Sequence, residues 1–163
     1  MLAMAFASAA AAAQPAASPW PRWGFSLPDL DGDRFLGPLD FRGPVLVNVW
    51  GIDCPPCVAE LPRLQAFALA HPAWTVLLVA TDAPSDARRF LRQRGIALPA
   101  VRGGAAAAGL MRRAGNRSGA LPFSVALEDG LICRVHTGEV SHDQLWDMHS
   151  HCERLPDRRT GPD

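Results

Sequence analysis

Two cysteines separated by two prolines restrict most strongly what this chain can fold into. Residues 44–50, just before them, form an apolar, largely β-branched run without sustained polar alternation, which is typical of a central strand covered on both faces. Residues 55–70, just after them, repeat apolar side chains at the spacing of one helix face. Cys54 therefore lies where a buried strand ends and a helix begins, and Cys57 lies one turn further along that helix.

The position of this pair favours redox chemistry. Only a thiolate attacks disulfides, and at a helix start that accommodates Pro55 the free backbone N–H groups and the helix dipole point at the sulfur of Cys54. Cys54 is then the exposed nucleophile and Cys57 the shielded resolving thiol. A static structural disulfide is an alternative. Half of a zinc site is another, although the sequence has no second C-x-x-C and no H-x-x-x-H to complete it.

Strand and helix patterns alternate along the rest of the chain. The Asp-Gly turn within residues 27–35 predicts a short N-terminal β extension. The later sequence predicts a strand at 74–81, helices near 85–95 and 105–115, a hairpin at 121–138 and a last helix at 141–155. Because parallel strands cannot be joined by tight turns, this order predicts an α/β fold with a central mixed β-sheet flanked by helices.

The chain of 163 residues has the size of one globular domain preceded by an apolar leader. The first residues are small and apolar, as in a secretory signal that ends in an A-x-A site near Ala13, although no basic residues precede them. We expect a signal peptide or flexible leader at 1–19, the domain at 20–156 and a loose tail at 157–163. The 16 basic residues balance 16 acidic ones, so no nucleic-acid partner is expected.

The sequence around the cysteines resembles a known family. Residues 45–64 and 119–130 resemble the thioredoxin superfamily, and within it the exported TlpA/ResA-like thiol–disulfide oxidoreductases; the likeness covers residues 27–155. The family motif reads W-x-x-W-C-x-P-C-x-x-E-x-P. The matching positions are Trp50, Cys54, Pro56, Cys57, Glu60 and Pro62.

The resemblance implies a thioredoxin-like fold and a groove that receives the substrate. Trp50 and Pro56 would shape this groove together with the family's cis-proline, which falls on Pro122. A proline at the first residue of a strand needs no cis bond, so a trans Pro122 is the alternative.

Glu60 lies three residues after Cys57 on the predicted helix. The resemblance implies that its carboxylate passes protons to or from the buried thiol, and a partly buried carboxylate beside a thiol has a raised pKa. Without the resemblance, a solvated helix glutamate is the simpler interpretation. Many thioredoxins bury an aspartate as proton acceptor where this chain has Asn48, which leaves Glu60 as the better candidate.

Asp53 departs from the family pattern, which has an aromatic residue before the first cysteine. A carboxylate beside a thiolate disfavours the charged sulfur, so we expect Asp53 to raise the pKa of Cys54 and to stabilise the disulfide against the dithiol. The couple should then be more reducing than the same scaffold with tryptophan at this position.

Cys133 and Cys152 form a second pair. Strand alternation places Cys133 on the face shared with Leu131 and Val135, and helical spacing turns Cys152 inward. If the last helix packs over its preceding strand, the two sulfurs can meet in a structural disulfide that closes about 20 residues. Two separate buried thiols are the alternative.

Three histidines stand near Cys152 in the sequence, at positions 142, 149 and 151. His149 shares a helix face with Cys152, whereas His151 points elsewhere, so one metal ion cannot easily gather them. We expect surface histidines, no metal site and no bound cofactor.

Together these features predict an exported, periplasmic thiol–disulfide oxidoreductase of the Gram-negative type. The resemblance implies that it reduces disulfides in exported proteins or in apo-cytochrome c, and that a membrane-embedded dithiol supplies its electrons. An even cysteine count suits an oxidising compartment, and an uncleaved leader would tether the protein, which we expect to be a monomer. An oxidase or isomerase is the near alternative. A copper-handling or redox-inert thioredoxin-like binding protein is the rival, although copper handlers on related scaffolds use C-x-x-x-C with a partner histidine.

Overall fold

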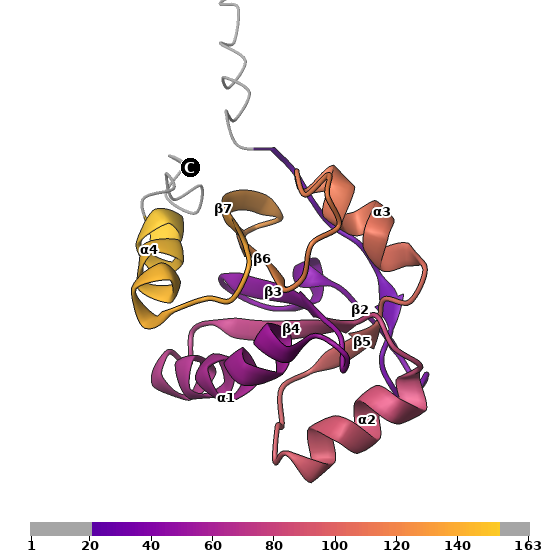
Figure 1. Cartoon of the computed structure of the whole chain (residues 1–163). Helices are drawn as coiled ribbons and strands as arrows, with labels where there is room; N and C mark the ends of the chain where they lie inside the picture. Colours follow the sequence, from indigo (N-terminus) through magenta and orange to yellow (C-terminus); the bar gives the residue numbers. More distant parts are fainter. Residues whose placement is uncertain (1–20, 154–163) are drawn as a thin grey trace, which may run out of the picture.

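The apolar run before the cysteines is the central strand, β3 (Val45–Trp50), of a five-stranded sheet (Figure 1). The computed structural model describes residues 21–153. In the sheet order β5-β4-β3-β6-β7, the first three strands are parallel, β6 is antiparallel to β3 and β7 is antiparallel to β6. The other strands are β4 (Thr75–Ala80), β5 (Ala100–Arg102), β6 (Phe123–Glu128) and β7 (Leu131–Thr137). The prediction of a mixed α/β sheet is confirmed.

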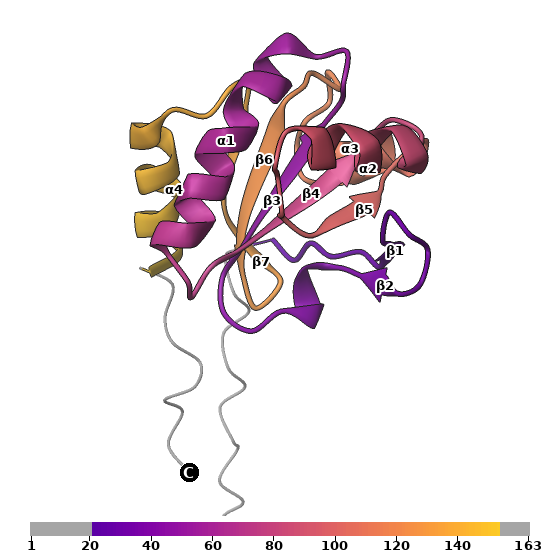
Figure 2. The same cartoon turned by 90° about the horizontal axis from the view of Figure 1, so that it is seen from below.

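Within the described residues, four α-helices cover the two faces of this sheet. They are α1 (Pro55–Ala70), α2 (Pro84–Gln93), α3 (Ala106–Arg113) and α4 (His142–Glu153). Apolar side chains of α1, α2 and α4 pack on one face, and those of α3 pack on the other. Figure 2 shows α1 and α4 lying side by side. Each fully buried Leu, Val or Phe of these two cores contributes roughly 1.5–3 kcal/mol relative to an exposed side chain.

Alternation along β3 decides which of its residues meet α1. Leu46 and Trp50 belong to the core beneath α1, whereas Val45, Val47 and Val49 belong to the core beneath α3. Asn48 therefore points to the α1 face, and all six residues of the strand are buried. Asn48 is thus the one polar residue of β3, and its side chain is enclosed between the sheet and α1.

The N-terminal segment packs across the α3 face. Its strands β1 (Leu27–Pro28) and β2 (Phe35–Leu36) pair antiparallel and are followed by the short 3-10 helix η1 (Pro38–Asp40). The buried indole of Trp23 donates to the carbonyl of Leu110 on α3 at 3.1 Å. The short β extension predicted from the Asp-Gly turn is therefore present, and it closes one face of the core.

The hairpin of β6 and β7 contains an irregularity that strand alternation did not predict. Ala126 pairs with Arg134 but Leu127 pairs with Ile132, so Cys133 is an extra residue with no direct partner. Cys133 belongs to the core under α1 and α4. Val135 is exposed and pairs with Val125, whose side chain belongs to the other core. The prediction that Cys133 and Val135 share a face is wrong, because a bulge adds one residue and breaks the alternation.

Two predicted segments, the leader at 1–19 and the tail at 157–163, lie outside the described residues. Within residues 21–153, no helix has the length and apolar character needed to span a bilayer. The domain limits at 20 and 156 remain predictions.

Candidate redox site

The two cysteines of the motif lie at the N-terminal end of α1. Cys54 is the N-cap residue, and a disulfide joins it to Cys57, with 5.2 Å between the two Cα atoms. The backbone N–H of Cys57 donates to the sulfur of Cys54 at 3.3 Å. Cys57 is fully buried, whereas Cys54 is partly exposed. Pro55 and Pro56 have no N–H, so the N–H of Cys57 is the donor of the helix end that is directed at the sulfur of the partly exposed cysteine.

The end of β4 holds the turn between β3 and α1. The carboxylate of Asp82 accepts the N–H of Ile52 at 2.8 Å, and the hydroxyl of Thr81 donates to the carbonyl of Trp50 at 3.1 Å. A Cβ added at Gly51 would lie 2.7 Å from the Thr81 hydroxyl oxygen, so only glycine allows this approach. Neither Asp82 nor Thr81 was predicted from the sequence. Their position directly after a parallel neighbour of β3 was the available signal, because the carboxyl ends of parallel strands meet at one sheet edge.

The residues predicted to shape a groove occupy different depths. Trp50 has no exposed surface and packs against Phe90 of α2, with 5.7 Å between ring centroids. Pro56 is partly exposed. The Leu121–Pro122 peptide bond is cis, and Pro122 is buried. A Cβ built on the glycine of the redox turn would lie 3.8 Å from the Leu121 side chain, so the cis-proline segment borders this turn. Trp50 thus supports the site from beneath and cannot touch a substrate in this conformation.

Glu60 is fully buried beneath the cysteine pair, in a network that joins distant segments. Its Oε1 accepts the side-chain amide of Asn48 at 2.7 Å, and its Oε2 accepts the backbone N–H of Val140 at 2.8 Å. The same amide nitrogen of Asn48 also donates to the hydroxyl of Ser124 at 3.0 Å. The interpretation of Glu60 as a solvated helix residue is therefore excluded. Sequence reasoning missed Ser124 and Val140, which lie far along the chain.

Burial raises the pKa of Glu60 from 4.5 to about 7, and the nearby carboxylate of Glu139 acts in the same direction. The N–H of Val140, the amide of Asn48 and the guanidinium of Arg63 oppose this shift because each stabilises the carboxylate. Arg63 and Glu139 also pair with each other at 3.1 Å. A carboxyl group that titrates near neutrality, one helical turn from the buried cysteine, is able both to accept and to release a proton.

The remaining position of the motif, Asp53, lies in the turn before the first cysteine. Its side chain is exposed. It therefore borders the reactive sulfur from the solvent side, where water and salt screen its charge.

The second pair, Cys133 on β7 and Cys152 on α4, is also joined by a disulfide. Its Cα atoms are 5.1 Å apart, and both cysteines are buried. An ion pair between Arg134 and Asp147 at 2.9 Å links the same two elements. These two links hold α4 against the edge strand β7.

The histidines near the second disulfide do not gather around a common point. His149 is stacked between Trp74 and Trp146, with ring centroids 5.5 Å and 5.3 Å away. His142 is exposed, and His151 contacts the backbone carbonyl of Asp147 through Nδ1 at 2.8 Å. In the part of the chain from 21 to 153, no three side chains of the metal-ligating types form a group.

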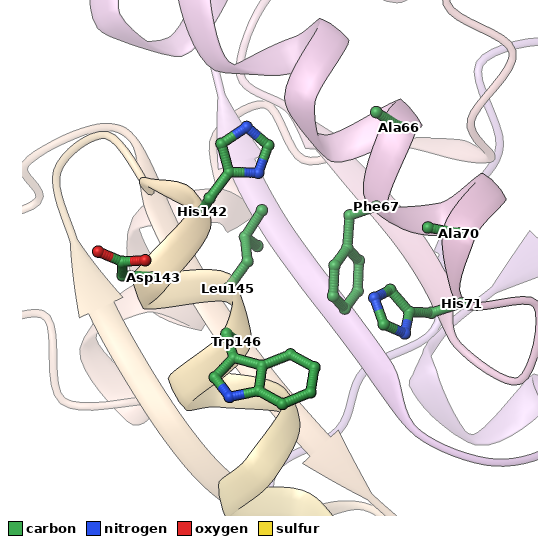
Figure 3. Close-up of a pocket in the computed structure, with 8 residues that line it drawn as sticks. All are labelled: Ala66, Phe67, Ala70, His71, His142, Asp143, Leu145 and Trp146. Carbon is green, nitrogen blue, oxygen red and sulfur yellow. The ribbon is translucent and has the colours of Figure 1, made fainter.

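A groove of about 410 Å³ separates α1 from α4 at the end of α1 that is remote from the cysteine motif. Figure 3 shows Phe67 and His71 of α1 facing Leu145 and Trp146 of α4 across this groove. None of the residues predicted to carry chemistry lines it. The site therefore lies at the N-terminal end of α1, and the groove is a separate feature.

Comparison with known proteins gives relatives of one kind. No protein-family model matches the chain. The thiol–disulfide oxidoreductase ResA of Halalkalibacterium halodurans is 30% identical over 128 residues, and the match covers 74% of this chain and 69% of that protein.

Solved structures extend this similarity. A Neisseria meningitidis protein classed as a thioredoxin has 27% identity and a TM-score of 0.68, over 83% of this chain and 91% of that one. A secreted thiol–disulfide isomerase from Corynebacterium glutamicum has 25% identity and a TM-score of 0.66, over 79% and 81% of the two chains. Both similarities cover most of the region from which the sheet and its helices are built.

Proposed function

The chain belongs to the ResA-like family of thiol–disulfide oxidoreductases, and we propose that it reduces disulfides in exported proteins or in apo-cytochrome c. The observation that carries this proposal is the asymmetry of the cysteine pair. Cys54 is partly exposed at a helix N-terminus, whereas Cys57 is fully buried in the helix that also carries Glu60. A nucleophile must meet its substrate, and a resolving thiol must be shielded until the mixed disulfide has formed.

In the reducing direction, each cysteine of the pair has a separate step. The thiolate of Cys54 attacks one sulfur of the substrate disulfide. A Cys54–substrate bond forms and the substrate S–S bond breaks. One substrate thiolate leaves and takes a proton from water. Glu60 accepts the proton of the Cys57 thiol, and the resulting thiolate attacks the sulfur of Cys54. The second substrate thiolate leaves and receives the proton from Glu60. Two electrons have then passed from the protein pair to the substrate, and no bound cofactor takes part.

The surroundings of the pair complete this proposal. Pro56 and the Leu121–Pro122 segment, of which Leu121 is partly exposed, form the rim that a substrate segment contacts, and Trp50 supports it from the core. A membrane-embedded dithiol reduces the pair again after each cycle. The secreted relative from Corynebacterium glutamicum supports export. We propose that this protein is periplasmic and acts as a monomer.

The midpoint potential of the Cys54–Cys57 couple tests the direction of the reaction. A reductase is expected to have a potential more negative than about −200 mV, whereas oxidases of this scaffold lie near about −120 mV. The measurement is an equilibrium titration against glutathione, read by thiol blocking and mass spectrometry. A potential near the oxidase value would overturn the reductase proposal while leaving thiol–disulfide exchange intact.

Two further assays separate the enzyme from a binding protein. We expect the reduced protein to catalyse insulin reduction, and a Cys57→Ser variant to accumulate the mixed disulfide at Cys54 because the second attack is missing. A redox-inert or copper-handling protein would show neither result. Stoichiometric Cu(I) binding by the reduced pair, without insulin reduction, would favour that rival.

A further inference from the structure

Three buried polar side chains form a continuous chain beneath the redox pair. Asn48 on β3 lies directly opposite Ser124 on β6, so both side chains point to the α1 face of the sheet. Glu60 approaches this pair from α1, and none of the three has any exposed surface. The amide nitrogen of Asn48 connects them, because it donates to Glu60 and to Ser124 at the same time.

Protonation of Glu60 changes which hydrogen-bonding groups its neighbours must provide. The ionised carboxylate accepts hydrogen bonds through both oxygens, whereas the neutral acid donates one. Bulk water does not reach this position, so the protein itself must offer a donor in the first state and an acceptor in the second. The backbone N–H of Val140 is only a donor. Of the groups seen to hydrogen-bond to Glu60 within residues 21–153, the Asn48 amide alone carries both a donor and an acceptor.

We propose that Asn48 is a positioning residue for proton transfer, and that its amide turns by half a rotation when Glu60 gains or loses a proton. With ionised Glu60, Nδ2 donates to Oε1, as in the structure. With neutral Glu60, the O–H formed on Oε1 donates to Oδ1 of Asn48. The inference rests on the proposed function, in which that proton comes from the Cys57 thiol.

Two features of the network allow this rotation. Oδ1 of Asn48 has no hydrogen-bond partner among the residues that the structure describes, so the rotation breaks no bond on that side. The hydroxyl of Ser124 accepts from Nδ2 in one orientation and can donate to Oδ1 in the other, because a hydroxyl is both donor and acceptor. A serine opposite an asparagine therefore tolerates both states of the carboxyl group.

The charged groups around Glu60 do not provide this pair of hydrogen bonds. Arg63, on the same helix, donates to the carboxylate of Glu139 and to the carbonyl of Val140. Its charge favours ionised Glu60, and the charge of Glu139 favours the neutral acid. Cys57 is bonded to its partner in the oxidised protein and does not titrate, so the oxidised state isolates the titration of Glu60.

The first test uses the unaltered oxidised protein and NMR between about pH 5 and about pH 9. We expect the side-chain carboxyl carbon of Glu60 and the amide protons of Asn48 to titrate with one shared midpoint near pH 7. The amide protons should lose the downfield shift of a charge-assisted hydrogen bond as the pH falls. Asn48 amide protons that stay unchanged through the Glu60 titration would overturn the proposal.

The second test removes the amide with Asn48→Leu. The ionised acid loses a charge-assisted bond that is about twice as strong as the neutral bond lost by the protonated form, so the Glu60 midpoint should rise by roughly 0.5 to 1 pH unit. The pH dependence of single-turnover substrate reduction should move by the same amount, and it should not move when Asn48→Leu is added to Glu60→Gln.

A matched control is Asn116→Leu. Asn116 is also buried, and it hydrogen-bonds to the carbonyl of Ala120 and to Ser118, away from Glu60. It should leave the Glu60 midpoint in place, and an unmoved midpoint in Asn48→Leu would contradict the positioning role. If Asn48→Leu fails to fold, the titration of the unaltered protein still decides. Because that titration needs no turnover, failure of this inference is distinguishable from failure of the reductase proposal.

Discussion

The two disulfides of this chain are the same bond in opposite settings. Cys54–Cys57 spans three positions at the open end of a helix, with one sulfur partly exposed and a buried carboxyl group nearby. Cys133–Cys152 spans 19 positions between an edge strand and the last helix, with both cysteines enclosed. The setting therefore separates a bond placed for exchange from a bond placed to hold α4 on the sheet. The following experiments test whether the first disulfide serves exchange and the second serves stability.

The largest expected difference is in activity. Cys54→Ser removes the attacking sulfur, so insulin reduction should fall by at least about 10³-fold. The double variant Cys133→Ala/Cys152→Ala should keep its rate within about threefold, since its sulfurs are remote from the exposed pair. Limited reduction of the unaltered protein, followed by thiol blocking and mass spectrometry, supplies the control. Modification of Cys133 before Cys54 would contradict the assignment of the first pair as the exchanging one.

The contributions of the two pairs to protein stability should have the reverse order, with the larger one from Cys133–Cys152. Loss of the second bond frees a loop of about 20 residues in the unfolded chain, so Cys133→Ala/Cys152→Ala should lower the free energy of unfolding by about 3 kcal/mol. The bond removed in Cys54→Ala/Cys57→Ala closes a far shorter loop, so this variant should lose less free energy of unfolding. Denaturant titrations at a common m-value measure both changes. Equal losses in the two variants would show that the second pair has no special structural role.

Of the two regions, only the redox region should make a large pH-dependent contribution to the free energy of unfolding. Glu60 has a pKa near 7 when folded and 4.5 otherwise, so the folded protein binds the proton more tightly between these values. Its contribution is complete below about pH 4.5 and is lost as the pH rises through about 7, a change of about 3 kcal/mol in the free energy of unfolding. Glu60→Gln should remove this slope between about pH 5 and about pH 8. A variant that keeps the full slope would assign it to other groups.

The parts of the redox site that are local in sequence were predictable. Cys54, Cys57 and Glu60 lie within two turns of one helix, so their spacing alone brings them together. The partners of Glu60 are not local: Asn48 is 12 positions away and Val140 is 80 positions away. No periodicity indicates that the segment before α4 packs over α1, so only the assembled fold shows that Glu60 is buried.

For the second cysteine pair, it was a local prediction that failed. Helical spacing and strand alternation predicted that both sulfurs face the core, and the two cysteines do lie there. The alternation failed at Val135, because the bulge at Cys133 shifts the register by one residue. A bulge depends on the pairing with β6, and the sequence of β7 alone carries no mark of it.

The smallest expected effect concerns Asp53, whose charge borders only the first pair. Removing it with Asp53→Asn, or replacing it as in Asp53→Trp, should favour the thiolate of Cys54 and make the potential less negative by up to about 30 mV at low ionic strength. Because the side chain is exposed, the effect should shrink in about 0.5 M salt. Asp143→Asn, an exposed carboxylate on α4, is the matched control and should leave the potential unchanged. An unchanged or more negative potential in the Asp53 variants would mean that the helix end alone sets the charge preference of the first sulfur.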